Sequence, residues 1–126
     1  MILVDTSVWI RHLRIPDVHL EQEISKNEIV THAFVVGELA VGSLHPRSTV
    51  LRLLRGLPHL LKASDDEVLA MISTRNLSSS GIGYMDAHLL ASLLISSHTK
   101  LWTFDKRFAE TAARVGVILH VGGSRP

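Results

Sequence analysis

The feature that most constrains the fold of this chain is the alternation of short aliphatic runs with longer segments of helical periodicity. The first run, residues 2–4, meets three polar residues and is followed by apolar residues at helical spacing over residues 8–13. Later aliphatic runs predict further strands at residues 28–31, 60–63, 101–104 and 117–121. Strands that alternate with helices in this way are typical of a mainly parallel sheet, here of four to five strands, covered by helices on both faces.

The segments between these strands carry further helix signals. Ser64 and Glu67 have the Ser-x-x-Glu spacing of a capping box, and Gly116 is suited to end the last helix. With 126 residues, 46% of them hydrophobic, the chain can form one core, so we predict a single domain over residues 1–121 and a short tail at residues 122–126. The further helices are expected at residues 33–43, 49–55, 64–76, 84–97 and 105–115.

Composition excludes several classes of protein. Thirteen Lys and Arg against twelve Asp and Glu leave a net charge of +1, so the total charge does not indicate a nucleic-acid partner. The absence of cysteine excludes disulfides, thiolate metal sites and thiol nucleophiles, and is compatible with a reducing cytosol. No basic signal-peptide segment opens the chain, and the longest uncharged apolar stretch, residues 89–95, falls short of the roughly 20 residues that cross a bilayer. We therefore predict a soluble cytoplasmic protein that does not contact a membrane.

Two acidic residues directly follow predicted strands. Asp5 comes after the first strand, and Asp105 comes after the run that begins at residue 101. In open α/β sheets, ligands bind beyond the carboxyl ends of the strands, so these two carboxylates are expected at one edge of the sheet. The hydroxyl groups of Thr6, Ser7 and Thr103 are close enough in sequence to hold them by hydrogen bonds.

Two further acids lie on the apolar sides of predicted helices. The residues three and four positions from Glu38 on either side are apolar or glycine, and Asp86 is followed at these positions by two leucines. No Lys or Arg lies within four positions of either acid, so ion pairing within the helix is not available. Helix capping alone would explain Asp5 and Asp105, and the helix dipole would explain Asp86, but neither explains Glu38.

Four carboxylates that converge on one pocket repel one another unless some are protonated or a cation neutralises them. A hard divalent cation, Mg²⁺ or Mn²⁺, suits such oxygen ligands and often binds together with substrate phosphates. The eight histidines show no paired zinc-ligand spacing. The four acids therefore predict a magnesium or manganese site.

Four motifs in this order resemble those of the PIN-domain nucleases, and their spacing is most similar to that of the VapC toxins of bacterial type II toxin–antitoxin systems. Each motif alone is common, and the order of all four over almost the whole chain carries the resemblance. The motifs are VDTSVWI at residues 4–10, VGEL at 36–39, GYMDA at 83–87 and TFDKRF at 103–108.

The resemblance implies a three-layer α/β/α sandwich, a Mg²⁺- or Mn²⁺-dependent endoribonuclease that is the toxin of a toxin–antitoxin pair, a homodimer, and inhibition by a cognate antitoxin protein. It assigns Asp5 and Asp86 as metal ligands, with Glu38 and Asp105 completing the catalytic site directly or through water. Arg11 stands where several relatives carry an acid, which alters a local contact and leaves these assignments in place. The family's supporting hydroxyls fall on Thr6 or Ser7 and on Thr103.

An acidic pocket needs positive charge around it to bind RNA. The segment between Glu38 and Asp65 holds no acid, and its basic residues, with Arg75 beside the polar loop 78–83, are candidate contacts for the phosphate backbone. A solvated helix face explains these arginines equally well. The apolar stripes at residues 50–57 and 89–95 are candidates for a dimer or antitoxin interface. The candidate RNA contacts are Arg47, Arg52, Arg55 and Arg75, with Lys62 in the same basic segment.

Two other classes of function compete with a nuclease. A phosphotransfer or receiver domain also places an aspartate after its first strand, but this chain lacks a second acid two residues after Asp5 and a phosphate-binding Gly-x-x-x-x-Gly-Lys loop. A non-catalytic RNA-binding module with the same fold is the second alternative. The intact set of four acids favours the enzyme.

Overall fold

The computed structural model describes residues 1–96 and 98–121, so the predicted tail at residues 122–126 lies outside the described part of the chain. Three parallel strands form the sheet in the order β2-β1-β3: β1 spans Ile2–Val4, β2 Ile29–Val30 and β3 Lys100–Trp102. In this register Leu3 of β1 lies between Val30 and Leu101. The first strand of the chain is thus the central strand of the sheet.

The predicted count of four to five strands is too high for the described residues. Residues 60–63 are not a strand. Beside β2 the chain pairs with the sheet only through a bridge between Thr31 and His59, and the amide of Ala63 then donates to the hydroxyl of Ser92, which lies in a helix. At the other edge the predicted strand 117–121 is reduced to a parallel bridge between Leu101 and Leu119. Five chain segments still run side by side in the predicted parallel arrangement, and the outer two are too short to count as strands.

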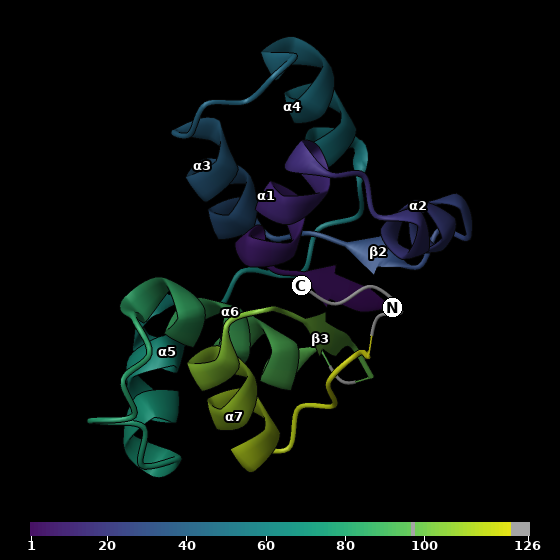
Figure 1. The fold of residues 1–126 in the computed structure, drawn as a ribbon. Helices are drawn as coiled ribbons and strands as arrows, with labels where there is room; N and C mark the ends of the chain where they lie inside the picture. The colour runs from purple at the N-terminus through teal and green to yellow at the C-terminus, as the bar shows by residue number, and fades with distance from the viewer. Residues whose placement is uncertain (97, 122–126) are drawn as a thin grey trace.

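Seven helices of the described chain cover the two faces of the sheet, which confirms the three-layer α/β/α class. In Figure 1, α1 to α4 lie above the sheet and α5 to α7 lie below it. This division follows from right-handed crossovers, because the chain moves outward from β1 through β2 and then returns to β3 on the other side. The helices are α1 Thr6–Arg14, α2 Val18–Ser25, α3 Ala33–Ala40, α4 Arg47–Gly56, α5 Asp65–Thr74, α6 Tyr84–Ile95 and α7 Lys106–Arg114.

Helix termini follow the sequence signals where these are strong. The capping box of Ser64 and Glu67 is formed at the start of α5, and Gly116, with a φ of 95°, follows the end of α7. Helix α2 was not predicted, because Leu20 is its only buried residue and its periodicity is therefore weak. Helix α3 ends at Ala40, three residues before the predicted end, where the amide of Gly42 bonds the carbonyl of Leu39 in a tight turn.

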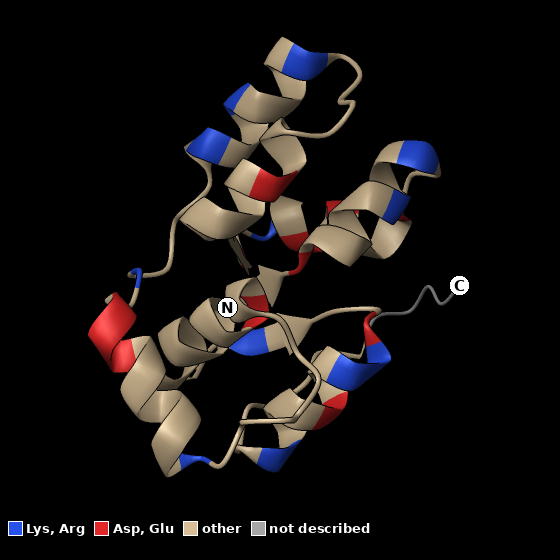
Figure 2. Ribbon diagram, turned by 90° about the vertical axis from the view of Figure 1, so that its left-hand side faces the viewer, with Lys and Arg blue, Asp and Glu red and all other residues tan. Residues whose placement is uncertain are grey.

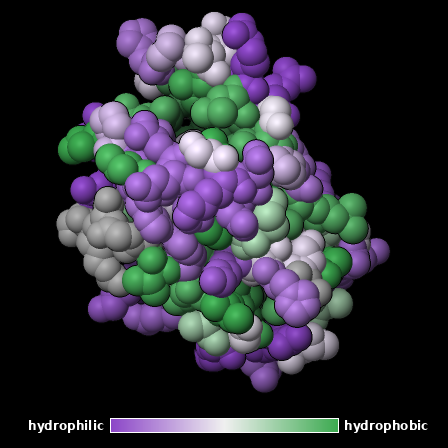
Figure 3. All heavy atoms as spheres, turned by 90° about the vertical axis from the view of Figure 1, so that its right-hand side faces the viewer, coloured by the Kyte–Doolittle hydropathy of each residue, from purple (hydrophilic) through white to green (hydrophobic). Residues whose placement is uncertain are grey.

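The core joins the sheet to both helical layers. Fully buried side chains include Leu3 of β1, Trp9 of α1, Leu90 of α6 and Phe108 of α7. All of residues 87–93 in α6 are buried, so most of the predicted apolar stripe at residues 89–95 belongs to the core. No helix in the described part of the chain has the length and hydrophobicity needed to cross a bilayer. On the side shown in Figure 3, hydrophilic side chains gather across the middle and divide the apolar ones into separate patches.

Candidate active site

The carboxyl ends of β1 and β3 bring together the first two groups of candidate residues. The backbone amide of Asp5, directly after β1, donates to the carbonyl of Trp102 at the end of β3, at 2.9 Å. Thr103 and Asp105 follow Trp102 in the chain. The parallel pairing of the two strands therefore places both polar segments at one edge of the sheet, as the sequence predicts.

Asp5 is a buried carboxylate, with 5% of its surface exposed, that does not cap the helix it precedes. Its Oδ2 atom accepts hydrogen bonds from the hydroxyls of Ser7, at 3.0 Å, and Thr103, at 2.7 Å. Within the described residues no hydrogen bond reaches Oδ1. Helix capping therefore does not explain Asp5, and two hydroxyls fix its orientation.

Glu38 reaches the same edge from α3. Its Oε1 atom accepts a hydrogen bond of 2.9 Å from the hydroxyl of Thr6, the residue that follows Asp5. Glu38 is partly buried, and within the described residues it forms no ion pair with a Lys, Arg or His side chain. The hydroxyls of Thr6 and Ser7 thus bind different acids, one from α3 and one from the end of β1.

Asp86 lies in the first turn of α6, after Gly83, which offers no side chain to cap the helix. Burial is the largest cause that raises the pKa of the Asp86 carboxyl, to about 7, and the negative charges of Asp5, Asp105 and Glu38 raise it further. The effect of these three charges places Asp86 near the other acids. The fold thus gathers four acids that are separated by up to 100 positions in the sequence.

Asp105 has a local structural role as well. It is exposed, and its Oδ1 atom accepts from the amide of Phe108 at 3.1 Å, which caps α7. Its own amide donates to the hydroxyl of Thr103 at 3.0 Å, so it is tied to the residue that holds Asp5. The capping explanation is correct for Asp105, and its charge still acts on Asp86.

The carboxylate oxygens of these four residues suit a hard divalent cation that only one or two of them bind directly. All four supply carboxylate oxygens, and the charge accumulated around Asp86 favours a cation. Among the residues that the structure describes, no three acids or histidines are gathered at metal-ligand spacing. The arrangement therefore fits Mg²⁺ or Mn²⁺ held by one or two carboxylates and by water, and it does not fit a closed cage of protein ligands.

The arginines predicted to contact RNA lie away from the acids. Arg47, Arg52 and Arg55 are exposed on α4, and Figure 2 shows Lys and Arg spread along this uppermost helix, with acidic residues lower on the same side. Arg75 is the C-cap of α5, whose other end meets the start of α6, so it lies about 15 Å along α5 from that end. None of them lines a cavity described beside the acids.

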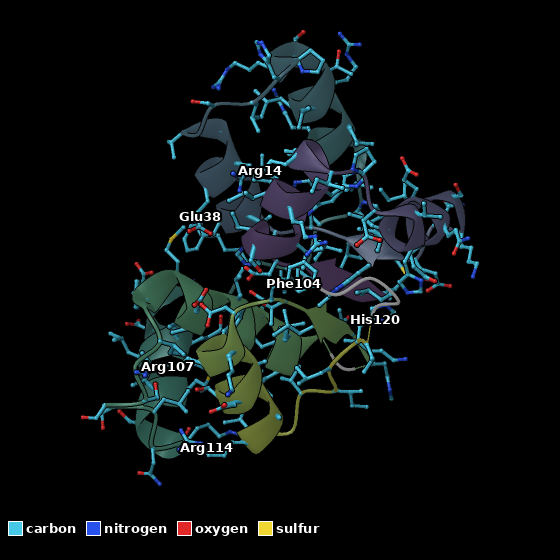
Figure 4. All side chains as sticks on the ribbon, in the orientation of Figure 1. Arg14, Glu38, Phe104, Arg107, Arg114 and His120 are labelled. Atoms are coloured by element: carbon cyan, nitrogen blue, oxygen red, sulfur yellow. The ribbon has the colours of Figure 1, made fainter. Side chains whose placement is uncertain are left out.

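Other basic residues lie nearer to the site, and sequence reasoning passed over them. A cavity of about 690 Å³ beside Ser7 is lined by Arg11, Arg14 and Phe104, and Figure 4 shows Arg14 on α1 and Phe104 below it. A signal existed in the sequence, because residues four and seven positions after Ser7 share its face of a helix. A second hollow of about 430 Å³, on the other side of Arg14, is lined by Glu38.

The histidines next to the site are structural. His88 is buried and its Nε2 atom lies 3.1 Å from Oδ1 of Asp65, which also accepts from the hydroxyl of Tyr84. His32 caps α3 through Nδ1 and lies 2.9 Å from the hydroxyl of Ser92 through Nε2. Burial, and then the charges of His88 and Lys62, lower the pKa of His32 to about 4, so it is neutral at physiological pH. These contacts tie α3 and α5 to α6.

Comparisons with known proteins agree with this architecture. Residues 2–114 match the model of the PIN domain family. The ribonuclease VapC32 of Mycobacterium tuberculosis, from strains CDC 1551 / Oshkosh and ATCC 25618 / H37Rv, is 44% identical over 119 residues, which are 94% of this chain and 96% of the relative. The solved structure of FitAB bound to an IR36 DNA fragment superposes with a TM-score of 0.64 over 95% of this chain and 94% of that chain. At 18% identity, that last similarity concerns the fold alone.

Proposed function

Because the chain belongs to the PIN-domain family and is a ribonuclease of the VapC type, we propose that it is the toxin of a toxin–antitoxin pair and hydrolyses RNA phosphodiesters at Asp5, Glu38, Asp86 and Asp105. The observation that carries the site assignment is the hydrogen-bonded arrangement of Asp5, Glu38 and Asp105 through the hydroxyls of Thr6, Ser7 and Thr103, beside which the Asp86 carboxyl lies close enough for their charges to raise its pKa. A cluster of this kind is unfavourable for folding and is expected where it binds a cation.

Each hydroxyl next to the acids has a definite part in this proposal. Thr103 and Ser7 hold one oxygen of Asp5 and leave the other for a ligand. Thr6 holds Glu38 in the same way. These contacts keep the carboxylates in place when no cation is bound, which lowers the cost of reorganising the site when RNA binds.

Asp5 and Asp86 are the proposed cation ligands, and Glu38 and Asp105 act directly or through water. When bound, Mg²⁺ or Mn²⁺ would supply positive charge for the scissile phosphate and lower the pKa of a nearby water. A carboxylate of the quartet that is not engaged with the cation can accept the proton of the attacking water. The charge of the quartet also repels RNA phosphates, and a bound cation would reduce this repulsion.

The test is the mapping of cleavage ends on total RNA treated with the purified protein, with Mg²⁺, with Mn²⁺ and with EDTA. We expect discrete new ends with either cation and none with EDTA. Asp86→Asn should lose the cleavage, because it keeps the shape of the side chain and removes the charge. Glu21→Gln is the matched control, since Glu21 is exposed on α2 and this change should leave cleavage intact. Cleavage by Asp86→Asn, or in EDTA, would contradict the proposal.

The proposed protein partner is an antitoxin that covers the hollow beside Glu38. This hollow of about 430 Å³ lies between α1, α3 and the segment that follows α3, and its wall is mainly apolar. A peptide that fills it would reach the acids and block RNA. Leu13→Asp, in the wall of the hollow, should therefore weaken inhibition by the antitoxin more than it weakens cleavage. The residues that line it are Ile10, Leu13, Arg14, Glu38, Leu39, Gly42, Ser43, Leu44 and His45.

We further propose that the protein is a homodimer that acts in the cytoplasm, where an RNA-cleaving toxin meets its substrate. Of the two apolar stripes considered as interfaces, the one on α4 is the more accessible, because Leu53 is 43% exposed whereas residues 87–93 of α6 are buried. Light scattering on the purified protein measures its mass in solution. A protein that has the mass of one chain at all concentrations would contradict the dimer.

A further inference from the structure

The cavity of about 690 Å³ next to the acidic residues has a lining that the four-acid site does not explain. It contains two arginines, one aromatic ring and two isoleucines. Ser7 is the only lining residue that donates a hydrogen bond to one of the four acids. Ile10 and Ile15 are 47% and 64% exposed, so the lining offers apolar surface as well as charge. The lining residues are Ser7, Ile10, Arg11, Arg14, Ile15 and Phe104.

This cavity is directly connected to Asp5. The hydroxyl of Ser7, in the cavity wall, donates to Oδ2 of Asp5 and accepts from the backbone amide of Phe104 at 3.0 Å. Ser7, Arg11 and Arg14 are spaced by four and three positions, so they follow one face of α1 away from the acids. From Ser7 to Arg14 this face extends about 10 Å. A chain bound at Asp5 that continues along this face must enter the cavity.

The two arginines have no acidic partner. Within the described residues neither Arg11 nor Arg14 forms an ion pair, although Glu38 shares the neighbouring hollow with Arg14. The guanidinium carbon of Arg11 lies 5.8 Å from the centroid of the Phe104 ring, and Phe104 is partly buried. An aromatic ring with one guanidinium group beside it and a second in the same cavity is a combination that single-stranded nucleic acids contact, with a base on the ring and phosphates on the cations.

We propose that this cavity binds the nucleotide adjacent to the cleaved phosphodiester, with its base stacked on Phe104 and its phosphate neutralised by Arg11 and Arg14. The inference rests on the proposed ribonuclease function, because it takes the position of Asp5 as the position of cleavage. The charge of the cavity excludes a basic occupant, and the aromatic ring distinguishes a nucleotide from an acidic peptide. The cavity would thereby set the direction in which RNA crosses the site.

The test measures binding without cleavage. A fluorescently labelled single-stranded RNA of mixed sequence is titrated by anisotropy against protein that carries Asp86→Asn, at several salt concentrations. Added to this background, Arg11→Ala and Arg14→Ala should each weaken binding about 3- to 10-fold and each reduce the slope of log K against log salt by about 0.7. Phe104→Leu should weaken binding at least about fivefold without a change in slope, and Phe104→Tyr should retain binding.

Two controls separate this site from general effects of charge and of folding. Lys100→Ala removes one positive charge at the amino end of β3, whereas the acids lie beyond the carboxyl ends of the strands. It should change neither the affinity for RNA nor the slope. An oligomer of abasic spacer phosphates should bind the Phe104→Leu protein as well as its parent, while the arginine variants still bind it more weakly. Thermal unfolding of each variant establishes that the compared proteins are folded.

The outcomes distinguish this inference from the proposed function. If the parent protein cleaves RNA but the arginine variants and Phe104→Leu bind RNA with the affinity of their background, the cavity is not a nucleotide site and the inference is overturned. The same holds if Phe104→Leu weakens binding to the abasic oligomer as much as to RNA, since no base is then involved. Absence of cleavage by the parent refutes the proposed function itself, whatever the binding assay gives.

Discussion

Two helices of this protein begin with a buried aspartate in an extended conformation, yet the two carboxylates do different things. Asp17, 4% exposed, accepts hydrogen bonds from the amides of His19 and Leu20 and so caps α2. Asp5, 5% exposed, makes no such bond at the start of α1 and accepts instead from the hydroxyls of Ser7 and Thr103.

The N-cap position of an aspartate therefore does not determine its role. Oδ1 of Asp17 accepts from two amides of the helix that it starts, while its buried Oδ2 has no hydrogen-bond partner among the described residues. Asp5 leaves the first amides of α1 without a side-chain acceptor and lies near three other acids, which stability alone does not favour. An arrangement that opposes stability in this way is expected at a functional site.

The largest expected contrast between the two aspartates is in cleavage. Asp5→Asn should reduce the rate of RNA cleavage by about 100- to 1000-fold, because it removes a charge from the proposed cation site. Asp17→Asn should leave the rate unchanged, since asparagine caps a helix as well as aspartate does. Single-turnover cleavage of one RNA by both variants measures the ratio. Equal rates for the two variants would remove the distinction.

A smaller effect is expected from the hydroxyl that holds Asp5. Thr103→Val removes the 2.7 Å hydrogen bond to Oδ2 with little change of shape and should slow cleavage by about 10-fold. Thr31→Val is the matched control, because the buried hydroxyl of Thr31 has no partner among the described residues and its loss should leave the rate unchanged. Cleavage measured at saturating Mg²⁺ compares the two. A Thr103→Val rate equal to that of the control would show that Asp5 does not depend on this bond.

The next effect is a pH-dependent change in the free energy of unfolding that arises from Asp86. The pKa of Asp86 is about 7 in the folded protein against 3.8 for a free side chain, so the folded state binds this proton more tightly. The resulting stabilisation is complete below pH 3.8 and is lost as pH rises through 7. We expect Asp86→Asn to raise the free energy of unfolding by about 1–2 kcal/mol at pH 8 in EDTA, a reduced value because Asp86 is only partly buried and solvent screens its charge. Near pH 4 the substitution should leave the free energy of unfolding unchanged.

Urea denaturation of both proteins at the two pH values measures this difference. A gain of the same size at pH 4 and pH 8 would mean that the charge on Asp86 is not its cause. Addition of Mg²⁺ at pH 8 should stabilise the parent more than the variant, because only the parent retains both proposed cation ligands.

The smallest expected effect is the loss of the cap on α2. Asp17→Ala should lower the free energy of unfolding by about 1 kcal/mol and leave the cleavage rate per folded molecule unchanged. Asp5→Ala has no cap to lose, and in EDTA it should cost less stability than Asp17→Ala, because the removal of one charge from the acidic cluster offsets the loss of the hydrogen bonds from Ser7 and Thr103. Thermal unfolding of both variants makes the comparison, and a larger loss for Asp5→Ala would contradict it.

Much of the fold could be predicted because its signals are local. The capping box at Ser64, the glycine after α7 and the alternation of strands with helices all depend on neighbours in sequence, and the structure confirms them. The errors in the number of helices and strands have one cause. Helix α2 buries only Leu20, and the two outer segments of the sheet pair through single bridges, so in each case the neighbouring elements decide the structure and local pattern does not.

The amino-acid sequence is enough to identify four acids without local basic partners, the hydroxyls next to them, and the class of fold that brings strand ends together. The arrangement of these groups depends on contacts between distant parts of the chain. The tertiary structure separated Asp5 from Asp17 and Asp105, because the hydroxyl that holds Asp5 belongs to Thr103, which directly follows β3 and is 98 positions away in the sequence. It also placed Phe104 beside Arg11, since the contact requires β3 and α1 to meet across the edge of the sheet, which no spacing along the chain reveals.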